Sequence, residues 1–161
     1  MKKALNAWTI PAQVSFEELF QKLSAAGYDG VELNLDREAG GHGLTMETTQ
    51  LQTAEIKKLS QTYNLPVHSI SSSLYTAETL GSDDPACRKQ AQDILRKQLE
   101  LASALGADGI LVVPGGVSDQ RSLTQAWDNC LESLSALKGE IVQSGIKVGV
   151  ENVWNGFFLS P

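Results

Sequence analysis

The order of polar and apolar residues repeats four times along the chain. Each repeat has an amphipathic stretch, then a glycine or asparagine, then a short run of β-forming residues. Glycine and asparagine tolerate the left-handed backbone conformation that ends many helices. We therefore expect four helix ends, each followed by a short loop and a strand, at Gly27, Asn64, Gly106 and Gly145.

Four helices are expected to precede these ends. Ser15 with Glu18 is typical of a capping box that opens the first helix, and Asp84 before Pro85 is typical of the start of the third. Gly139 predicts a bend or a break in the fourth helix, because glycine is a poor helix former. The expected helices cover residues 15–26, 51–63, 85–105 and 122–144.

Five short strands complete the pattern. Strands that alternate with helices are expected to be parallel and to be joined by right-handed crossovers. No glycine-rich phosphate loop follows the first strand, where an open doubly wound sheet usually carries one. We therefore predict an α/β fold of the parallel (β/α) TIM-barrel type. The expected strands cover residues 4–8, 30–35, 67–72, 109–113 and 147–151.

A closed barrel of this type needs eight strands and about 250 residues. The sequence has 161 residues. The prediction is therefore a single domain over residues 1–161 that forms an incomplete barrel, from about the first to the fifth of eight strands. Two open sheet edges and an uncovered inner face predict that such a piece forms a homo-oligomer.

Composition and charge narrow the expected partners. Hydrophobic residues make up 42% of the chain and charged residues 20%, as in ordinary soluble proteins. A formal net charge of −6 without a basic cluster argues against nucleic acids and anionic membranes, and leaves small molecules as partners. No signal-peptide core develops before Pro11, which favours a cytoplasmic location. Cys87 and Cys130 have no His or second Cys nearby and are expected to be buried or half-buried thiols.

The candidate chemistry lies where strands end, because functional groups of parallel barrels gather at the carboxyl ends of the strands. Side chains one residue apart point to opposite faces, so Glu32 and Asn34 share the face opposite the apolar residues of their strand. The same alternation turns Glu151 inward at the end of the fifth strand. A carboxylate there can bind a divalent cation, abstract a proton beside a carbonyl, or pair with a Lys or Arg elsewhere in the barrel.

The histidines and aromatic residues each allow two interpretations. His68 comes early in its strand, so it either lies deep in the barrel, hydrogen-bonded and inert, or contacts a ligand. His42, in a glycine-rich loop, is expected to face solvent, with contact to the substrate as the alternative. Large aromatic side chains near a barrel mouth either wall a sugar pocket or simply pack, and these are Trp8, Tyr75 and Trp154. The candidate substrate-binding residues are Asn6, Trp8, Glu32, Asn34, His68, Trp154 and Asn155.

Three segments, at residues 26–34, 111–115 and 150–155, resemble the xylose-isomerase-like TIM barrel superfamily, and specifically its sugar phosphate isomerase/epimerase branch. The resemblance implies one divalent cation, Mn²⁺, Mg²⁺, Co²⁺ or Zn²⁺, held by two Glu, one Asp and one His on strands five to eight. Glu151 alone matches such a position, as the first metal ligand and as one of two carboxylates that relay a proton beside a ketose carbonyl. The other ligands have no counterpart before Pro161.

Three functions remain open at this point. The leading hypothesis is a metal-dependent isomerase or epimerase that acts, as the intact barrel, on a ketose or its phosphate through an enediolate. The resemblance also extends to metal-dependent lyases, dehydratases and endonucleases, although the acidity of the chain disfavours a nuclease. The third hypothesis is a catalytically inactive half-barrel fragment.

Overall fold

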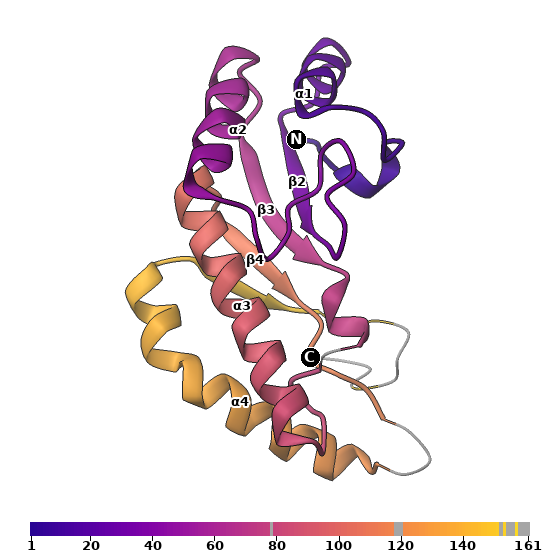
Figure 1. The fold of residues 1–161 in the computed structure, drawn as a ribbon, viewed down its shortest axis with the longest axis vertical. Helices are drawn as coiled ribbons and strands as arrows, with labels where there is room; N and C mark the ends of the chain where they lie inside the picture. Colours follow the sequence, from indigo (N-terminus) through magenta and orange to yellow (C-terminus); the bar gives the residue numbers. More distant parts are fainter. Residues whose placement is uncertain (78, 118–120, 152, 154–156, 158–161) are drawn as a thin grey trace.

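Five parallel strands form one sheet, and they lie in it in the order β1-β2-β3-β4-β5 (Figure 1). The computed structural model describes residues 1–77, 79–117, 121–151, 153 and 157. Strands that are neighbours in sequence are also neighbours in space, which is the order of a barrel; a doubly wound sheet reverses its order at a switch point. The expected fold class, an α/β fold with the first five strands of a barrel, is confirmed.

The observed elements agree closely with the expected ones. The strands are β1 (Ala4–Asn6), β2 (Gly30–Leu35), β3 (Val67–Ser72), β4 (Gly109–Val112) and β5 (Lys147–Val150). The helices are α1 (Phe16–Ala25), α2 (Gln50–Thr62), α3 (Pro85–Leu105) and α4 (Leu123–Ser144), with the short 3₁₀ helices η1 (Ala7–Thr9) and η2 (Leu74–Thr76).

The four expected helix ends are confirmed by the backbone. Gly27, Asn64, Gly106 and Gly145 have φ angles of 77°, 48°, 77° and 68°, all in the left-handed region. Each residue therefore ends its helix and turns the chain toward the next strand.

Two details of the helices differ from expectation. At Ser15 the hydroxyl accepts a hydrogen bond from the Glu18 amide at 3.2 Å, whereas the reciprocal pair of a full capping box occurs at Thr49 and Gln52. The expected break at Gly139 is wrong, because α4 is one helix through that position. Apart from the helix's own backbone, nothing described lies within 4 Å of the place where a Cβ atom at Gly139 would stand, so no close contact requires glycine there.

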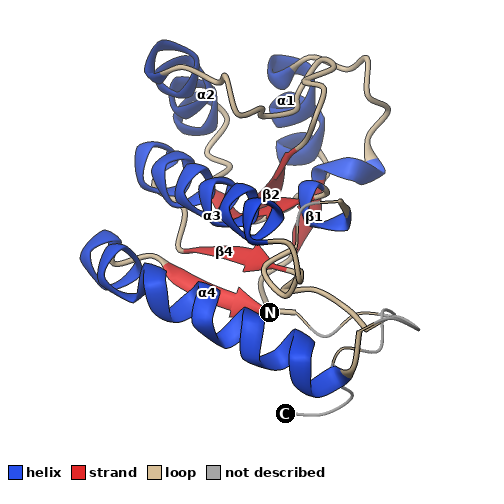
Figure 2. Ribbon diagram, turned by 60° about the horizontal axis from the view of Figure 1, so that its bottom comes forward, coloured by secondary structure: helices blue, strands red, loops and turns tan. Residues whose placement is uncertain are grey.

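The core lies between the sheet and its helices. Figure 2 shows α2, α3 and α4 side by side along one face of the sheet. Three side chains of β2, Val31, Leu33 and Leu35, point to this face and are fully buried. Glu32 and Asn34 between them point to the other, concave face, as the alternation of the strand predicts.

One buried amide joins β3 and β4 where their backbone pairing stops. The two strands pair only at Ser69 with Gly109 and at Ile70 with Ile110. The Gln98 side chain of α3 then donates to the carbonyls of Ile70 at 3.0 Å and Leu111 at 3.1 Å. Its own oxygen accepts the Tyr75 hydroxyl at 2.8 Å. Gln98 thereby links α3 to both strands beside the point where their pairing ends.

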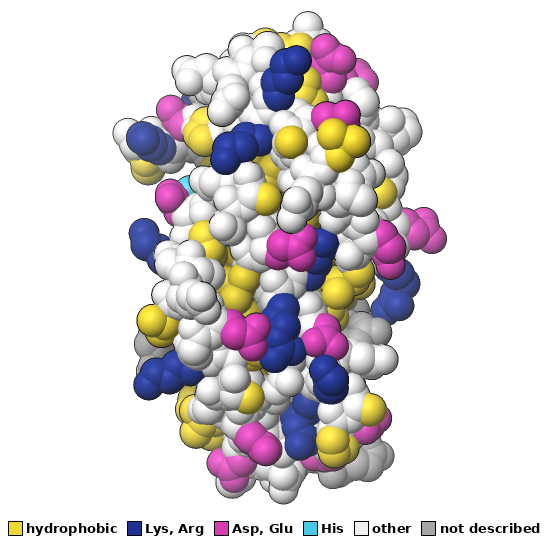
Figure 3. Space-filling view, turned by 60° about the vertical axis from the view of Figure 1, so that its left-hand side comes forward, with side chains coloured by type: hydrophobic (Ala, Val, Ile, Leu, Met, Phe, Trp, Pro, Cys, Tyr) yellow, Lys and Arg dark blue, Asp and Glu magenta, His cyan; other side chains and the backbone are white. Residues whose placement is uncertain are grey.

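The outer face carries charges of both signs. In Figure 3, basic and acidic side chains are interspersed over this helical side of the molecule, without a field of one sign. Arg96 of α3 donates to Glu140 of α4 at 2.9 Å, and this contact lowers the pKa of Glu140. No helix within the described residues is long and apolar enough to cross a membrane.

Both cysteines are free thiols, as expected. Cys130 is buried against the core, and this burial raises its pKa to about 11. Cys87 is partly exposed at the start of α3. Thiolate is the reactive form of cysteine, so burial makes Cys130 inert at neutral pH.

We predict that Gln98→Leu lowers the free energy of unfolding by about 2–4 kcal/mol, because it removes three buried hydrogen bonds, to the carbonyls of Ile70 and Leu111 and from the Tyr75 hydroxyl. Urea unfolding followed by circular dichroism measures this change. Gln90→Leu, at an exposed position of the same helix, is the matched control and is expected to change stability by less than about 0.5 kcal/mol. Equal stabilities of the two variants would contradict the role of Gln98.

Candidate active site

A network of polar side chains covers the concave face of the sheet. The Glu32 carboxylate accepts hydrogen bonds from the Asn6 amide at 2.7 Å and the Ser69 hydroxyl at 2.6 Å. The Asn34 amide donates to Asn6 at 3.2 Å and to Ser71 at 2.6 Å. Three adjacent strands thus hold Asn6, Glu32 and Asn34 together, as the sequence predicts for residues at strand ends.

Trp8 stands at the mouth of this face. The expected strand 4–8 stops at Asn6, and the side chain of Asn6 caps η1 by accepting the Trp8 amide at 2.8 Å. This cap turns the chain and leaves the indole half exposed, at 52%. The indole nitrogen donates to Asp36 at 2.9 Å.

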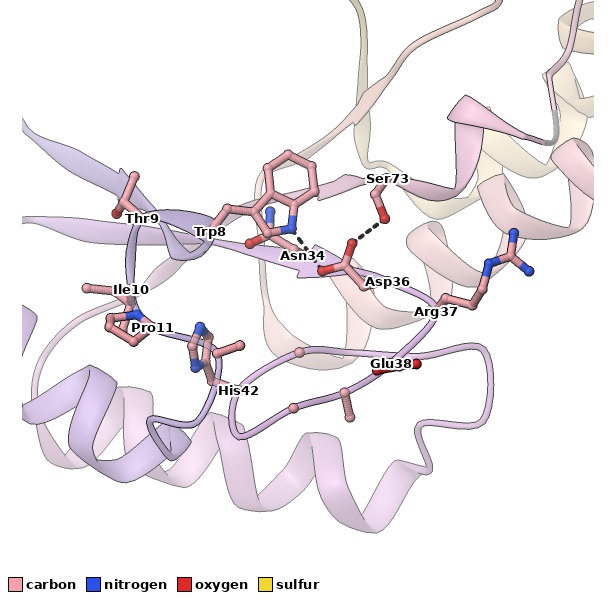
Figure 4. A pocket seen from close by; sticks show the side chains of 14 residues that line it. Trp8, Thr9, Ile10, Pro11, Asn34, Asp36, Arg37, Glu38, His42 and Ser73 are labelled. Carbon is pink, nitrogen blue, oxygen red and sulfur yellow. Dashed lines mark hydrogen bonds between the residues drawn. The ribbon is translucent and has the colours of Figure 1, made fainter.

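Asp36 links three strand ends, and the sequence reasoning missed it. It follows β2 directly, and its second carboxylate oxygen accepts the hydroxyl of Ser73, which follows β3 (Figure 4). Trp8, Asp36 and Ser73 therefore form a chain of contacts across the ends of β1, β2 and β3. The rule that chemistry gathers at strand ends could have found Asp36, since it is the first residue beyond its strand.

A cavity of about 790 Å³, which we call the Asp36 cavity, opens beside these residues. It lies between the loop after β1 and the loop after β2 (Figure 4). Its polar lining includes Asn34, Asp36, Arg37, Glu38 and Ser73.

His42 forms a fixed wall of this cavity, and the expectation that it faces solvent is wrong. The side chain is buried, with its ring nitrogens 2.7 Å from the Val14 carbonyl and 3.2 Å from the Ala7 carbonyl. The neighbouring glycine makes this possible, since a Cβ atom at Gly41 would lie 2.2 Å from the Val14 oxygen. The two loops pack closely because that side chain is absent.

Glu151 lines a second cavity, of about 510 Å³, which we call the Glu151 cavity. Its amide donates to the Val112 carbonyl at 2.9 Å, which continues the pairing of β4 and β5 by one residue. The cavity also contains Leu111 and Val113, which alternate with the buried, helix-facing Ile110 and Val112 of β4. Glu151 therefore lies at the carboxyl end of β5 on the inner side, and its cavity shares Trp8 and Ser73 with the Asp36 cavity.

The remaining candidates are placed differently. Tyr75 lines the Glu151 cavity, but its hydroxyl bonds to Gln98, and burial raises its pKa far above the usual range. His68 lies at the start of β3, at the other end of the sheet, where it is exposed and 3.8 Å from Asp108. The deep, hydrogen-bonded position considered for it is wrong, and it does not join the strand-end group. Trp154 and Asn155 lie outside the described residues.

The sequence matches the family model of the xylose isomerase-like TIM barrel over residues 20–160. The chain belongs to this family. A comparison with curated protein sequences found no match.

Solved structures confirm the xylose isomerase-like fold. A D-psicose 3-epimerase crystallised with D-fructose is 14% identical, with a TM-score of 0.75 over 95% of this chain and 53% of its own. A D-tagatose 3-epimerase-like protein is 19% identical, with a TM-score of 0.75 and coverages of 95% and 53%. A 3-keto-D-glucoside 4-epimerase from E. coli is 19% identical, with a TM-score of 0.74 and coverages of 96% and 57%. The chain spans about half the length of these structures.

The described part of this xylose isomerase-like chain does not by itself fit a metal site. Within it, no three His, Cys, Asp or Glu side chains converge. Glu151 is the one carboxylate among the residues that line its cavity, and the charged partner there, Arg121, is paired with Asp83 at 3.0 Å. A tight divalent-cation site needs several oxygen or nitrogen ligands, and one carboxylate supplies too few.

We predict that the 161-residue chain binds Mn²⁺ or Zn²⁺ weakly or not at all, with dissociation constants above about 10⁻⁴ M, as for sites with few ligands. Titration calorimetry of the isolated chain measures this affinity, with Glu151→Gln as the control for heat that arises elsewhere. Tight binding that Glu151→Gln abolishes would contradict the prediction and would indicate a site assembled between copies.

Proposed function

We propose that the protein is a metal-dependent sugar or sugar phosphate isomerase or epimerase that moves a proton beside a ketose carbonyl, and that residues 1–161 supply the first five strands of its barrel. The observation that carries the proposal is the position of Glu151, whose carboxylate lines a cavity at the carboxyl end of β5. The family match and the epimerases among the structures of the same fold support it.

The cavity suits a hydroxyl-rich substrate. Trp8 offers a large half-exposed apolar surface. The Ser73 hydroxyl donates to Asp36, and its oxygen can still accept a hydrogen bond from a sugar hydroxyl. Glu151 is a carboxylate within this enclosure, where it can remove a proton from the carbon beside the carbonyl to leave an enediolate. A second carboxylate, outside the described residues, is proposed to return the proton on the other face.

Other candidate residues are proposed to support the substrate rather than react with it. Asn6, Glu32 and Asn34 bond to one another, so they fix the floor of the concave face. Their hydrogen bonds also hold the backbone of Trp8, through Asn6. Trp154 and Asn155 stay candidate substrate contacts on the strength of the sequence resemblance alone.

Metal dependence is part of this proposal. A divalent cation, Mn²⁺, Mg²⁺, Co²⁺ or Zn²⁺, is proposed to bind Glu151 together with ligands from a part of the protein outside the described residues. A cation there would polarise the carbonyl and lower the cost of the enediolate. The cytoplasmic location and the absence of nucleic-acid partners, both expected from the sequence, stay predictions.

Glu151→Gln in the full natural protein is expected to lower kcat by at least about 10³-fold, because the amide neither accepts the proton nor carries the negative charge. A coupled assay over ketoses and ketose phosphates, with solvent deuterium incorporation beside the carbonyl, measures the loss. Glu132→Gln on the exposed side of α4 is the matched control and should leave kcat unchanged. A Glu151→Gln protein that retains deuterium exchange would overturn the role of Glu151.

We also propose that the isolated chain self-associates. In the sheet β1 and β5 each pair on one side only, and Leu123, Trp127 and Leu131 form an exposed stripe on α4 at successive turns. Light scattering of the 161-residue chain at micromolar concentration is expected to give a dimer or larger species. Leu131→Lys should weaken the association about tenfold or more, whereas Glu132→Lys next to it should have a smaller effect. A stable monomer would contradict the proposal.

A further inference from the structure

We propose that the Asp36 cavity binds a second sugar ring, so that the substrate of the Glu151 cavity is the ketose unit of a reducing disaccharide rather than a free ketose. The second ring is attached through a hydroxyl of the ketose and not through its anomeric carbon, so the ketose can still open to the carbonyl that the proposed reaction needs. This inference rests on the proposed function, whose reacting ring occupies the Glu151 cavity. It adds a binding site at the ends of β1 and β2 and names an uncharged, hydroxyl-rich ligand for it.

The Asp36 cavity and the Glu151 cavity are adjacent and share two lining residues. Trp8 and Ser73 line both of them, so a ligand can extend from Glu151 past the indole to Asp36. Their volumes, about 790 and 510 Å³, both lie in the range of small-molecule sites. A single ring at Glu151 would leave the neighbouring cavity to solvent, whereas a two-ring ligand would use both.

The indole of Trp8 is held in a way that leaves it available to a ligand. Its backbone amide is fixed by Asn6 and its ring nitrogen by Asp36, so both of its polar groups already have partners. About half of its surface is nonetheless exposed, and among the described residues no aromatic ring stacks on it. A flat apolar surface of this kind matches the C–H face of a sugar ring.

Asp36 supplies the polar side of the same site. Its two oxygens accept one hydrogen bond each, from Trp8 and from Ser73, and each carboxylate oxygen has room for a second donor. Sugar hydroxyls are such donors. Because the carboxylate is already oriented, a hydroxyl that binds it requires little rearrangement of the protein.

The charges that line the cavity favour an uncharged ligand. The lining contains two carboxylates, of Asp36 and Glu38, and one guanidinium, of Arg37, so its negative charges exceed its positive ones. A phosphate group would meet two carboxylates there, and like charges at close range repel. A hydroxyl-rich ring gains from carboxylate acceptors instead.

The loops around the cavity are pre-formed. The Gly41 amide donates to the Ala12 carbonyl at 2.7 Å, and His42 lies between two carbonyls of the neighbouring loop. The wall opposite Asp36 therefore exists before any ligand binds, as in most small-molecule sites.

The decisive experiment measures binding to the full natural protein that carries Glu151→Gln, so that no turnover occurs. Calorimetry compares a reducing disaccharide, whose ketose unit has a free anomeric carbon, with the free ketose and with the ketose phosphate. The disaccharide is expected to bind at least tenfold more tightly than the free ketose. Adding Asp36→Asn should reduce that advantage to threefold or less, because the amide is a weaker acceptor for sugar hydroxyls.

Two further variants complete the test. Glu38→Gln, on the exposed rim of the cavity, should lower the disaccharide affinity two- to tenfold even if Asp36→Asn folds poorly. Glu55→Gln, exposed on α2, is the control and should change neither affinity.

Equal affinities for disaccharide and ketose overturn the inference, as does an advantage that both cavity variants retain. A ketose phosphate that binds more tightly than the disaccharide, and more tightly still after Asp36→Asn, also overturns it. This test can be told apart from the test of the proposed function. If the unmutated protein turns over no ketose, the proposed isomerase activity is refuted. The ratio of disaccharide affinity to ketose affinity still decides whether the second ring is bound.

Discussion

The three hydrogen bonds of the Gln98 side chain join the helical layer to the sheet where β3 and β4 diverge. Backbone pairing between β3 and β4 ends after two residues of each strand, and a buried carbonyl without a partner would be costly. Gln98 donates from α3 to one carbonyl of each strand, so its side chain bonds to both β3 and β4 beside the point where they diverge. The Glu151 cavity lies at this divergence, lined by Ser72 and Leu111. A residue of the helical layer thus joins the two strands beside a cavity on the other side of the sheet.

The acidic side chains on the concave side of the sheet accept hydrogen bonds from uncharged donors. Glu32 accepts from Asn6 and Ser69, and Asp36 accepts from Trp8 and Ser73. Amides, hydroxyls and an indole keep a carboxylate hydrogen-bonded while leaving its charge uncancelled, unlike a salt bridge with Lys or Arg. Such a surface retains a negative potential toward its open side, which suits polar neutral ligands and cations better than anions.

Much of the fold could be predicted because it is encoded locally. A residue with left-handed backbone conformation ends each helix. The four helix ends could therefore be predicted from local sequence alone, at Gly27, Asn64, Gly106 and Gly145. The inward direction of Glu32 and Asn34 followed from alternation along one strand. Two errors concern the elements themselves. The break expected at Gly139 does not occur, and the first strand ends early, because the Asn6 side chain bonds to the backbone of Trp8 and turns the chain into η1.

The residues that were missed or misplaced depend on contacts between distant parts of the chain. His42 is buried by a loop that lies about 30 positions earlier in the sequence, and the close approach at Gly41 is not visible in the sequence pattern. Gln98 reads as one polar residue among others on a helix, although it is fully buried. Asp36 is the intermediate case, since its place after β2 was predictable but its bonds to Trp8 and Ser73 were not.

The bonds of Asp36 to Trp8 and Ser73 fix the indole of Trp8, which lies between the two cavities. Trp8 is held from β1 through Asn6 and from β2 through Asp36, and Asp36 is held in turn from β3 through Ser73. A shift of any of these three strand ends would move the indole, and the indole borders both cavities. The proposed sugar site beside Asp36 and the proposed reaction site beside Glu151 are therefore linked through the Trp8 side chain. Because Trp8 is already held in place by these bonds, a ligand in either cavity meets an ordered indole, which lowers the entropic cost of binding.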